Sequence, residues 1–143
     1  MKQIFTLKLM KIAAISAVIF ILLDLIWIGV VASQMYTEHL GFLANVKNGN
    51  IQFILPVGLF VQAIISLGLS VLIYTALLLD NRMIFSCLIG AFTGFVIYFT
   101  YDFTNYSFVK DWPLHVSIID VCWGTFQGLL AGIYVHALNK RLH

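Results

Sequence analysis

Charged residues are scarce in this chain of 143 residues, where Asp, Glu, Lys and Arg together make up only 10%. A typical soluble domain carries roughly 25% charged residues, so the composition excludes an ordinary soluble enzyme and a disordered chain. The net charge of +2 is too small to attract a polyanion, and we expect no nucleic-acid partner. Hydrophobic residues make up 62% of the chain, which indicates an integral membrane protein.

Cysteine is almost as rare, since Cys87 and Cys122 are the only two. Both lie in apolar stretches, in different predicted helices and at different depths. We therefore expect neither a disulfide nor a metal site and interpret both as small hydrophobic residues. Phosphate-binding loops, nucleophile elbows and metalloprotease motifs are also absent from the sequence.

No cofactor is expected, because the four histidines fall near the predicted membrane surfaces. None forms a pair at matched depth on facing helices, as b-type haem binding requires. A zinc site built from Asp102, His115 and His39 is an alternative that the spacing allows but does not favour.

Four apolar stretches are long enough for a transmembrane helix, which needs about 20 residues. They cover approximately residues 12–32, 53–78, 83–101 and 113–138. The first has the basic start of a signal peptide, but its apolar run is too long and Asp24 interrupts it, so we interpret it as a retained span. Because backbone groups must be satisfied within lipid, each span is predicted to be helical. We predict an all-α, polytopic four-helix bundle that forms one integral membrane domain over residues 1–143.

Basic residues favour one orientation of this bundle. Six of them lie at the two chain ends and in the short loop between the second and third spans: Lys2, Lys8, Lys11, Arg82, Lys140 and Arg141. The other side has only Lys47 and Lys110. The positive-inside rule then predicts that both termini are cytoplasmic (N-in/C-in) and that segments 33–52 and 102–112 face outward.

Each predicted span has one polar edge, as a bundle with a polar interior requires. The residues on these edges are Asp24 and Trp27, then Gln62, then Tyr98, Tyr101, Asp102 and Asn105, and finally Asp120, Trp123 and Gln127. With a rise of about 1.5 Å per residue, Asp24, Gln62 and Asp120 lie roughly 10–14 Å below the outer surface. Tyr101 and Asp102 lie above them. We expect an outward-facing polar cavity between the helices.

Asp24 and Asp120 would lie inside the membrane with no Lys or Arg at their depth. A carboxylate at mid-membrane costs about 2.5–3.5 kcal/mol on insertion scales, so we expect at least one of the two to be protonated at neutral pH. Together with Asp102 they are the candidate catalytic acids. In the alternative interpretation, each acid anchors a hydrogen-bond network that fixes helix register. Each deep acid is followed three residues later by a tryptophan, which indicates either pseudo-symmetry or a chance match.

Glycines spaced by four residues follow Asp120 along the last span, at positions 124, 128 and 132. Such ridges let helix backbones approach closely. We therefore assign helix packing to Gly124, Gly128 and Gly132, and to Gly90 and Gly94 in the third span. The sequence does not distinguish packing within one chain from a homodimer formed through this ridge.

Four segments carry a resemblance to a known family: DLIWIG at 24–29, YDFTN at 101–105, WPL at 112–114 and DVCWG at 120–124. Together they are similar to a family of predicted bacterial membrane proteins catalogued only as a domain of unknown function. The resemblance implies a small four-span protein of the bacterial inner membrane. It implies no activity, substrate or catalytic residue.

Three functions fit these residues, and we rank binding of a lipid or another apolar molecule first. Asp24 and Asp120 would orient its polar end. The residues that would contact it are Trp27, Gln62, Tyr98, Tyr101, Asn105, Trp123 and Gln127. The second function is a lipid-modifying enzyme that uses Asp24 and Asp120 as acid and base. The third is a proton-coupled transporter working as a dimer. Membrane lipids are expected partners in all three.

Overall fold

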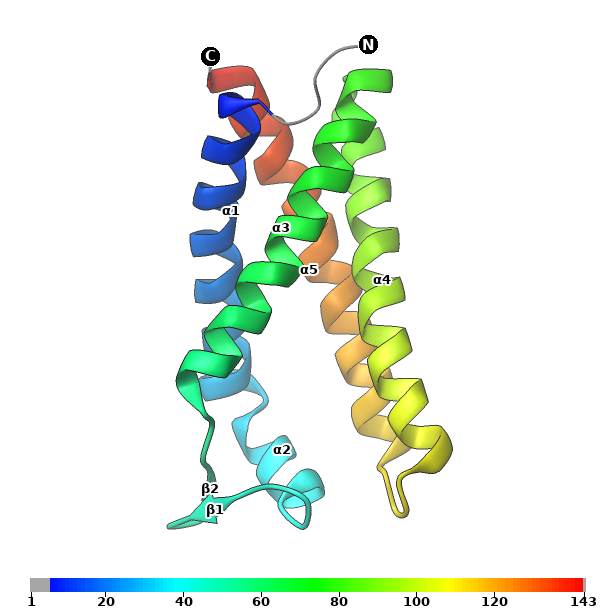
Figure 1. The fold of residues 1–143 in the computed structure, drawn as a ribbon. Helices are drawn as coiled ribbons and strands as arrows, with labels where there is room; N and C mark the ends of the chain where they lie inside the picture. The colour runs from blue at the N-terminus through cyan, green and yellow to red at the C-terminus, as the bar shows by residue number, and fades with distance from the viewer. Residues whose placement is uncertain (1–5, 143) are drawn as a thin grey trace.

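The computed structural model describes residues 6–142, and its four long helices form a bundle (Figure 1). They are α1 (Leu7–Ile26), α3 (Leu55–Leu79), α4 (Met83–Phe108) and α5 (Leu114–Arg141). Each is long and apolar enough to cross a membrane, counting the short extension of α1. The predicted all-α class with four membrane spans is therefore confirmed.

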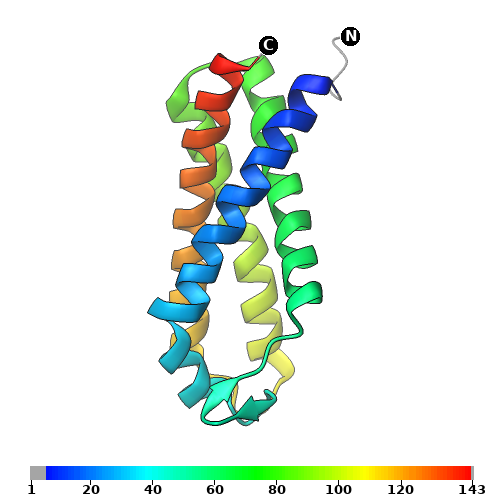
Figure 2. The same ribbon diagram turned by 90° about the vertical axis from the view of Figure 1, so that its left-hand side faces the viewer.

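The two ends of the bundle differ in what they carry (Figures 1 and 2). At one end, here called the terminal end, lie the start of α1, the end of α5 and the turn from α3 to α4. At the other, the hairpin end, lie α2 (Ser33–Leu40) and the strands β1 (Val46–Lys47) and β2 (Asn50–Ile51). Lys2 lies outside the described residues, while the other basic residues assigned to the cytoplasmic side all lie at the terminal end.

The helix boundaries differ from the prediction at the hairpin end. α4 continues to Phe108 instead of ending near residue 101, so the predicted outward loop 102–112 is mostly helix. Hydropathy marks where apolar residues stop, whereas the polar residues that follow continue the same helix. Asn105 Nδ2 donates to the Tyr101 carbonyl oxygen at 3.0 Å, and Ser107 Oγ donates to that of Thr104 at 2.6 Å.

The first span also changes character before it ends. After Ile26 the chain forms a π-helix over Trp27–Val31, and Ala32 N donates to the Trp27 carbonyl oxygen at 2.7 Å. Such π segments are rare and occur frequently at functional sites. The extra residue in this turn precedes the change of direction into α2.

The segment predicted as an outward loop contains a small hairpin as well as α2. β1 and β2 pair antiparallel, with Val46 opposite Ile51. The turn residues Asn48 and Gly49 have φ angles of 53° and 75°. Positive φ at both positions is the type I′ geometry that Asn-Gly favours, so this dipeptide was a hairpin signal.

Helices α4 and α5 pack backbone to backbone along the predicted glycine ridge. A Cβ at Gly90 would collide with the carbonyl oxygen of Gly128, and one at Gly94 with that of Gly124. At the third contact, a Cβ at Gly132 would meet the backbone of α4, and Ser86 Oγ donates to the Gly132 carbonyl oxygen at 3.0 Å. The ridge is therefore a contact within the chain.

Substituting a glycine of this ridge should destabilise the bundle. In Gly128→Ala the added methyl group would force α4 and α5 apart, and we expect the free energy of unfolding to fall by about 1–3 kcal/mol. Gly68→Ala is the matched control, because a Cβ there meets nothing and alanine favours a helix by about 1 kcal/mol. Unfolding in detergent measures both variants, and equal stabilities would contradict the packing argument.

The predicted orientation can be tested with single cysteines. In a background with Cys87→Ala and Cys122→Ala, we expect a membrane-impermeant maleimide to label Lys47→Cys but not Lys140→Cys in intact cells. These residues lie at the hairpin end and the terminal end respectively. The opposite labelling pattern would reverse the orientation, and labelling of both only after lysis would show that neither end faces outward.

Candidate functional site

The carboxyl group of Asp24 on α1 meets side chains from all three other membrane helices. Gln62 Nε2 on α3 donates to Asp24 Oδ2, and Trp123 Nε1 on α5 donates to Oδ1 at 3.1 Å. The hydroxyl of Tyr98 on α4 lies 3.5 Å from Oδ1. Asp24 is only 3% exposed, so these donors replace the water that it would otherwise bind.

Gln127 on α5 extends this network and is fully buried. Its Oε1 accepts a hydrogen bond from the Tyr98 hydroxyl at 3.0 Å, and its Nε2 donates to the Phe20 carbonyl oxygen of α1 at 3.3 Å. The Tyr98 ring occupies the space that a Cβ at Gly124 would fill. The glycine ridge therefore also lets the Tyr98 hydroxyl reach the site.

The second deep acid, Asp120 on α5, is bonded by a residue from outside the four spans. The hydroxyl of Tyr36 on α2 donates to Asp120 Oδ1, and Trp27 Nε1 donates to the Tyr36 oxygen at 3.0 Å. Burial and the neighbouring Asp120 carboxylate both raise the pKa of Tyr36 above its ordinary value of 10.0. The hydroxyl therefore stays protonated and remains a donor at neutral pH.

The two tryptophans that follow the deep acids stack on each other. The ring centroids of Trp27 and Trp123 are 4.4 Å apart, with 4° between the ring planes. Each indole N–H is directed to the acid of the other helix: Trp123 bonds Asp24 directly, and Trp27 reaches Asp120 through the Tyr36 hydroxyl. In the repeated Asp-x-x-Trp spacing, each tryptophan thus serves the aspartate of the other repeat. A packed aromatic pair joins the acids here, which differs from the central polar cavity that we expected.

Asp102 is the least satisfied acid of the site. It is 1% exposed, and neither of its carboxylate oxygens has a hydrogen-bond partner among the described residues. It lies near Asp120 of α5. Its neighbour Ser117 on α5 accepts a hydrogen bond from Trp112 Nε1 at 2.9 Å. We expected Asp102 at an outer loop, but it lies inside α4.

Two of the predicted ligand-binding residues lie away from this network. Tyr101 is 64% exposed, and its ring meets Trp112 edge-on with centroids 6.3 Å apart. Asn105 bonds the Tyr101 backbone. The helical periodicity placed Tyr101 and Asn105 on the same face as Tyr98 and Asp102. In the structure the Tyr101 side chain is exposed, whereas the side chain of the next residue, Asp102, is buried.

A groove opens between the hairpin-side halves of α1 and α3, with a volume of about 90 Å³. Asp24 and Gln62 are its only strongly polar residues. The others that line it are Ile21, Leu25, Ile28, Phe53, Leu55, Gly58 and Leu59. The groove therefore combines an apolar wall with one hydrogen-bonding position.

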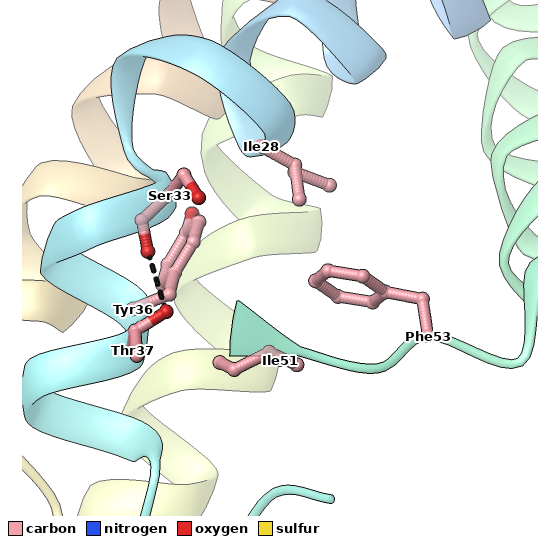
Figure 3. Close-up of a pocket in the computed structure, with 6 residues that line it drawn as sticks. All are labelled: Ile28, Ser33, Tyr36, Thr37, Ile51 and Phe53. Atoms are coloured by element: carbon pink, nitrogen blue, oxygen red, sulfur yellow. Dashed lines mark hydrogen bonds between the residues drawn. The ribbon is translucent and has the colours of Figure 1, made fainter. Parts of the chain in front are cut away.

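A smaller pocket of about 30 Å³ lies next to the groove, under the hairpin (Figure 3). Ile28 and Phe53 line both spaces. Its polar side is formed by Ser33, Tyr36 and Thr37 of α2, where Thr37 Oγ1 donates to the Ser33 carbonyl oxygen at 2.9 Å. The groove thus continues toward a polar corner that includes the partner of Asp120.

The histidines offer no metal site in the part of the chain that the structure describes. His39 and His115 contact each other edge to face, with ring centroids 4.2 Å apart. No group of three or more His, Cys, Asp or Glu side chains is placed to hold a metal ion within residues 6–142. The zinc alternative therefore has no ligand cluster there.

Residues 9–136 match the model of a protein family described as predicted membrane protein (DUF2177). The chain belongs to this family. The match begins in the first turn of α1, reaches His136 on α5 and includes every residue of the network around Asp24 and Asp120. No curated protein and no solved structure matches the chain.

Tyr36 is the member of the site that the sequence did not predict. It lies beyond the first apolar run, in a segment interpreted as loop, so no argument about helix faces applied to it. Recognising residues 33–40 as a short helix would have been the necessary signal.

Removing the Tyr36 hydroxyl should destabilise the site in a pH-dependent manner. Tyr36→Phe leaves Asp120 without this donor, and we expect a loss of about 1–3 kcal/mol in the free energy of unfolding near neutral pH. Because the folded-state pKa of Tyr36 is raised, its contribution is complete below about pH 10 and falls above it.

The measurement is unfolding in detergent of both proteins between about pH 6 and about pH 11. The stability difference should be constant at the lower values and shrink above about pH 10. Tyr106→Phe, at an exposed position on α4, is the control. A difference that does not change with pH would contradict the role given to the Tyr36 hydroxyl.

Proposed function

We propose that the protein binds an amphipathic molecule with one hydrocarbon chain in the groove between α1 and α3. The composition of the groove supports this most directly, because its wall is apolar except at Asp24 and Gln62. Ligand pockets commonly have this character, with few polar groups that fix orientation. The polar end would lie at Asp24 and Gln62, and the chain would extend along the apolar wall.

The rim of the groove supports entry from the lipid. Leu25 on α1 and Leu55 on α3 are 46% and 55% exposed, on a surface that lipid would cover. A molecule dissolved in the bilayer can therefore enter sideways between the helices. With the predicted orientation, it comes from the outer leaflet.

The volume of the groove limits what part of the molecule it holds. At about 90 Å³ the groove is smaller than the roughly 300–1,000 Å³ of common ligand pockets. The groove therefore takes the first few carbons beside the polar end, and the remaining chain lies on the lipid-facing surface of α1 and α3.

Binding fits this geometry better than the two alternatives. An acid–base pair must reach the same bound molecule, but only Asp24 lines the groove, while Asp120 is held by Tyr36. A transporter needs access from both ends. The terminal half is instead filled by an apolar core that includes Leu9, Ile12 and Ile73.

Filling the groove should weaken binding. We expect a fatty alcohol brominated beside its hydroxyl to quench the fluorescence of Trp27 and Trp123 in nanodiscs, measured in a Trp112→Phe background. Gly58 lines the groove and a Cβ there meets nothing, so Gly58→Leu adds a side chain to the groove wall. We expect it to weaken quenching at least about fivefold, equivalent to about 1 kcal/mol.

Gly68→Leu is the matched control for this experiment. Gly68 lies on the same helix and is equally open, but it does not line the groove. Its quenching curve should equal that of the parent protein. If Gly58→Leu and Gly68→Leu quench alike, the groove is not the binding site.

A further inference from the structure

We propose that the polar end of the bound molecule is a protonated amine, so that the ligand is a single-chain aliphatic amine and not a phosphate or carboxylate amphiphile. This inference rests on the proposed function and specifies the chemistry of the same groove. The inference follows from which donors and acceptors of the site already bond to other protein groups and which have no partner.

The donors around Asp24 are all directed at protein acceptors. Gln62 Nε2 and Trp123 Nε1 donate to Asp24, and the Tyr98 hydroxyl donates to Gln127 Oε1. Around Asp120 the same holds, because Trp27 Nε1 donates to Tyr36 and Tyr36 donates to Asp120. At the groove an anionic end group would find one spare donor, the second N–H of the Gln62 amide, and no cation.

The atoms left without a partner are acceptors. Among the residues that the structure describes, the unpartnered buried side-chain atoms on the hairpin side of the bundle are Gln62 Oε1 and both carboxylate oxygens of Asp102. The others are hydroxyl groups further toward the terminal end, on Ser16, Ser66, Ser70 and Tyr134. Gln62 lines the groove and its Oε1 is buried without a partner, so a rotation of the Gln62 side chain would let this oxygen accept an N–H from a ligand there.

Charge favours the same end group. Asp24, Asp102 and Asp120 lie in one layer, and every Lys and Arg of residues 6–142 lies at an end of the bundle. An anionic end group would face these acidic side chains with no cation near it, which disfavours its binding. An ammonium group forms charge-assisted hydrogen bonds with carboxylates.

The number of donors distinguishes an amine from an alcohol. An ammonium group has three N–H donors, so it can bond Asp24 and Gln62 Oε1 together, whereas a hydroxyl group has one. The expected order of affinity is therefore amine, then alcohol, then phosphate.

The experiment measures how dodecylamine, dodecanol and dodecyl phosphate displace the brominated alcohol from the Trp112→Phe protein in phosphatidylcholine nanodiscs. Gly58→Leu under the same conditions shows how much of the signal depends on the groove. We expect dodecylamine to displace the probe at a concentration at least about tenfold lower than dodecyl phosphate.

Asp24→Asn tests the origin of this preference, because it removes the charge but keeps the side-chain size and an acceptor oxygen. The advantage of dodecylamine over dodecanol should fall at least about threefold. Glu38→Gln is the control, since it removes an exposed charge on α2 at the same end of the bundle. Its amine preference should be unchanged.

Two different failures can be told apart. If the brominated alcohol does not bind, the proposed function fails. If it binds but dodecyl phosphate displaces it as well as dodecylamine does, the groove remains a binding site and the amine inference is overturned. An unchanged preference in folded Asp24→Asn also overturns it. If that variant does not fold, the comparison of amine and phosphate on the parent protein still decides.

Discussion

The buried carboxyl group of Asp24 is the constraint on which the hairpin half of the bundle depends. Lipid offers it no hydrogen bonds, and no cation lies at its depth, so its partners must come from other helices. Gln62, Tyr98 and Trp123 lie near it from α3, α4 and α5. Each membrane helix therefore has its position and rotation restricted by one small group of atoms.

Close packing of α4 against α5 makes this arrangement accessible. Tyr98 reaches toward Asp24 and Gln127 because its ring lies against Gly124, where any larger residue would displace it. Further along the same interface, Gly90, Gly94 and Gly128 keep the two backbones in contact. The ridge thus has two effects, because it stabilises the helix pair and also places a hydroxyl group in the polar layer.

The two halves of the bundle are built from different interactions. The terminal half has an apolar core between α1, α3 and α5, with Leu9, Ile73 and Val135 fully or nearly buried. The hairpin half combines polar networks with an open groove beside Asp24. The apolar core makes the terminal half rigid. The hairpin half keeps a groove where an incoming molecule finds unpaired acceptors. This difference is the reason for placing the proposed function at the hairpin end.

The sequence by itself determined the membrane setting, the four spans and the common depth of Asp24, Gln62 and Asp120. These features follow from hydropathy and from a fixed rise per residue, which are local properties of a helix. It also identified the glycine ridge, but the partner of that ridge depended on which helix lies against α5.

Only the tertiary structure decided how the polar residues meet. Trp27 stacks on Trp123, and Tyr36 bonds to Asp120, so these contacts join segments that are distant in the sequence. The groove that Gly58 lines also lies between two such segments, α1 and α3. Their geometry depends on helix rotation, on the π-helical turn and on the path into α2. Periodicity describes which residues share a face, but it contains no information on which neighbour that face meets.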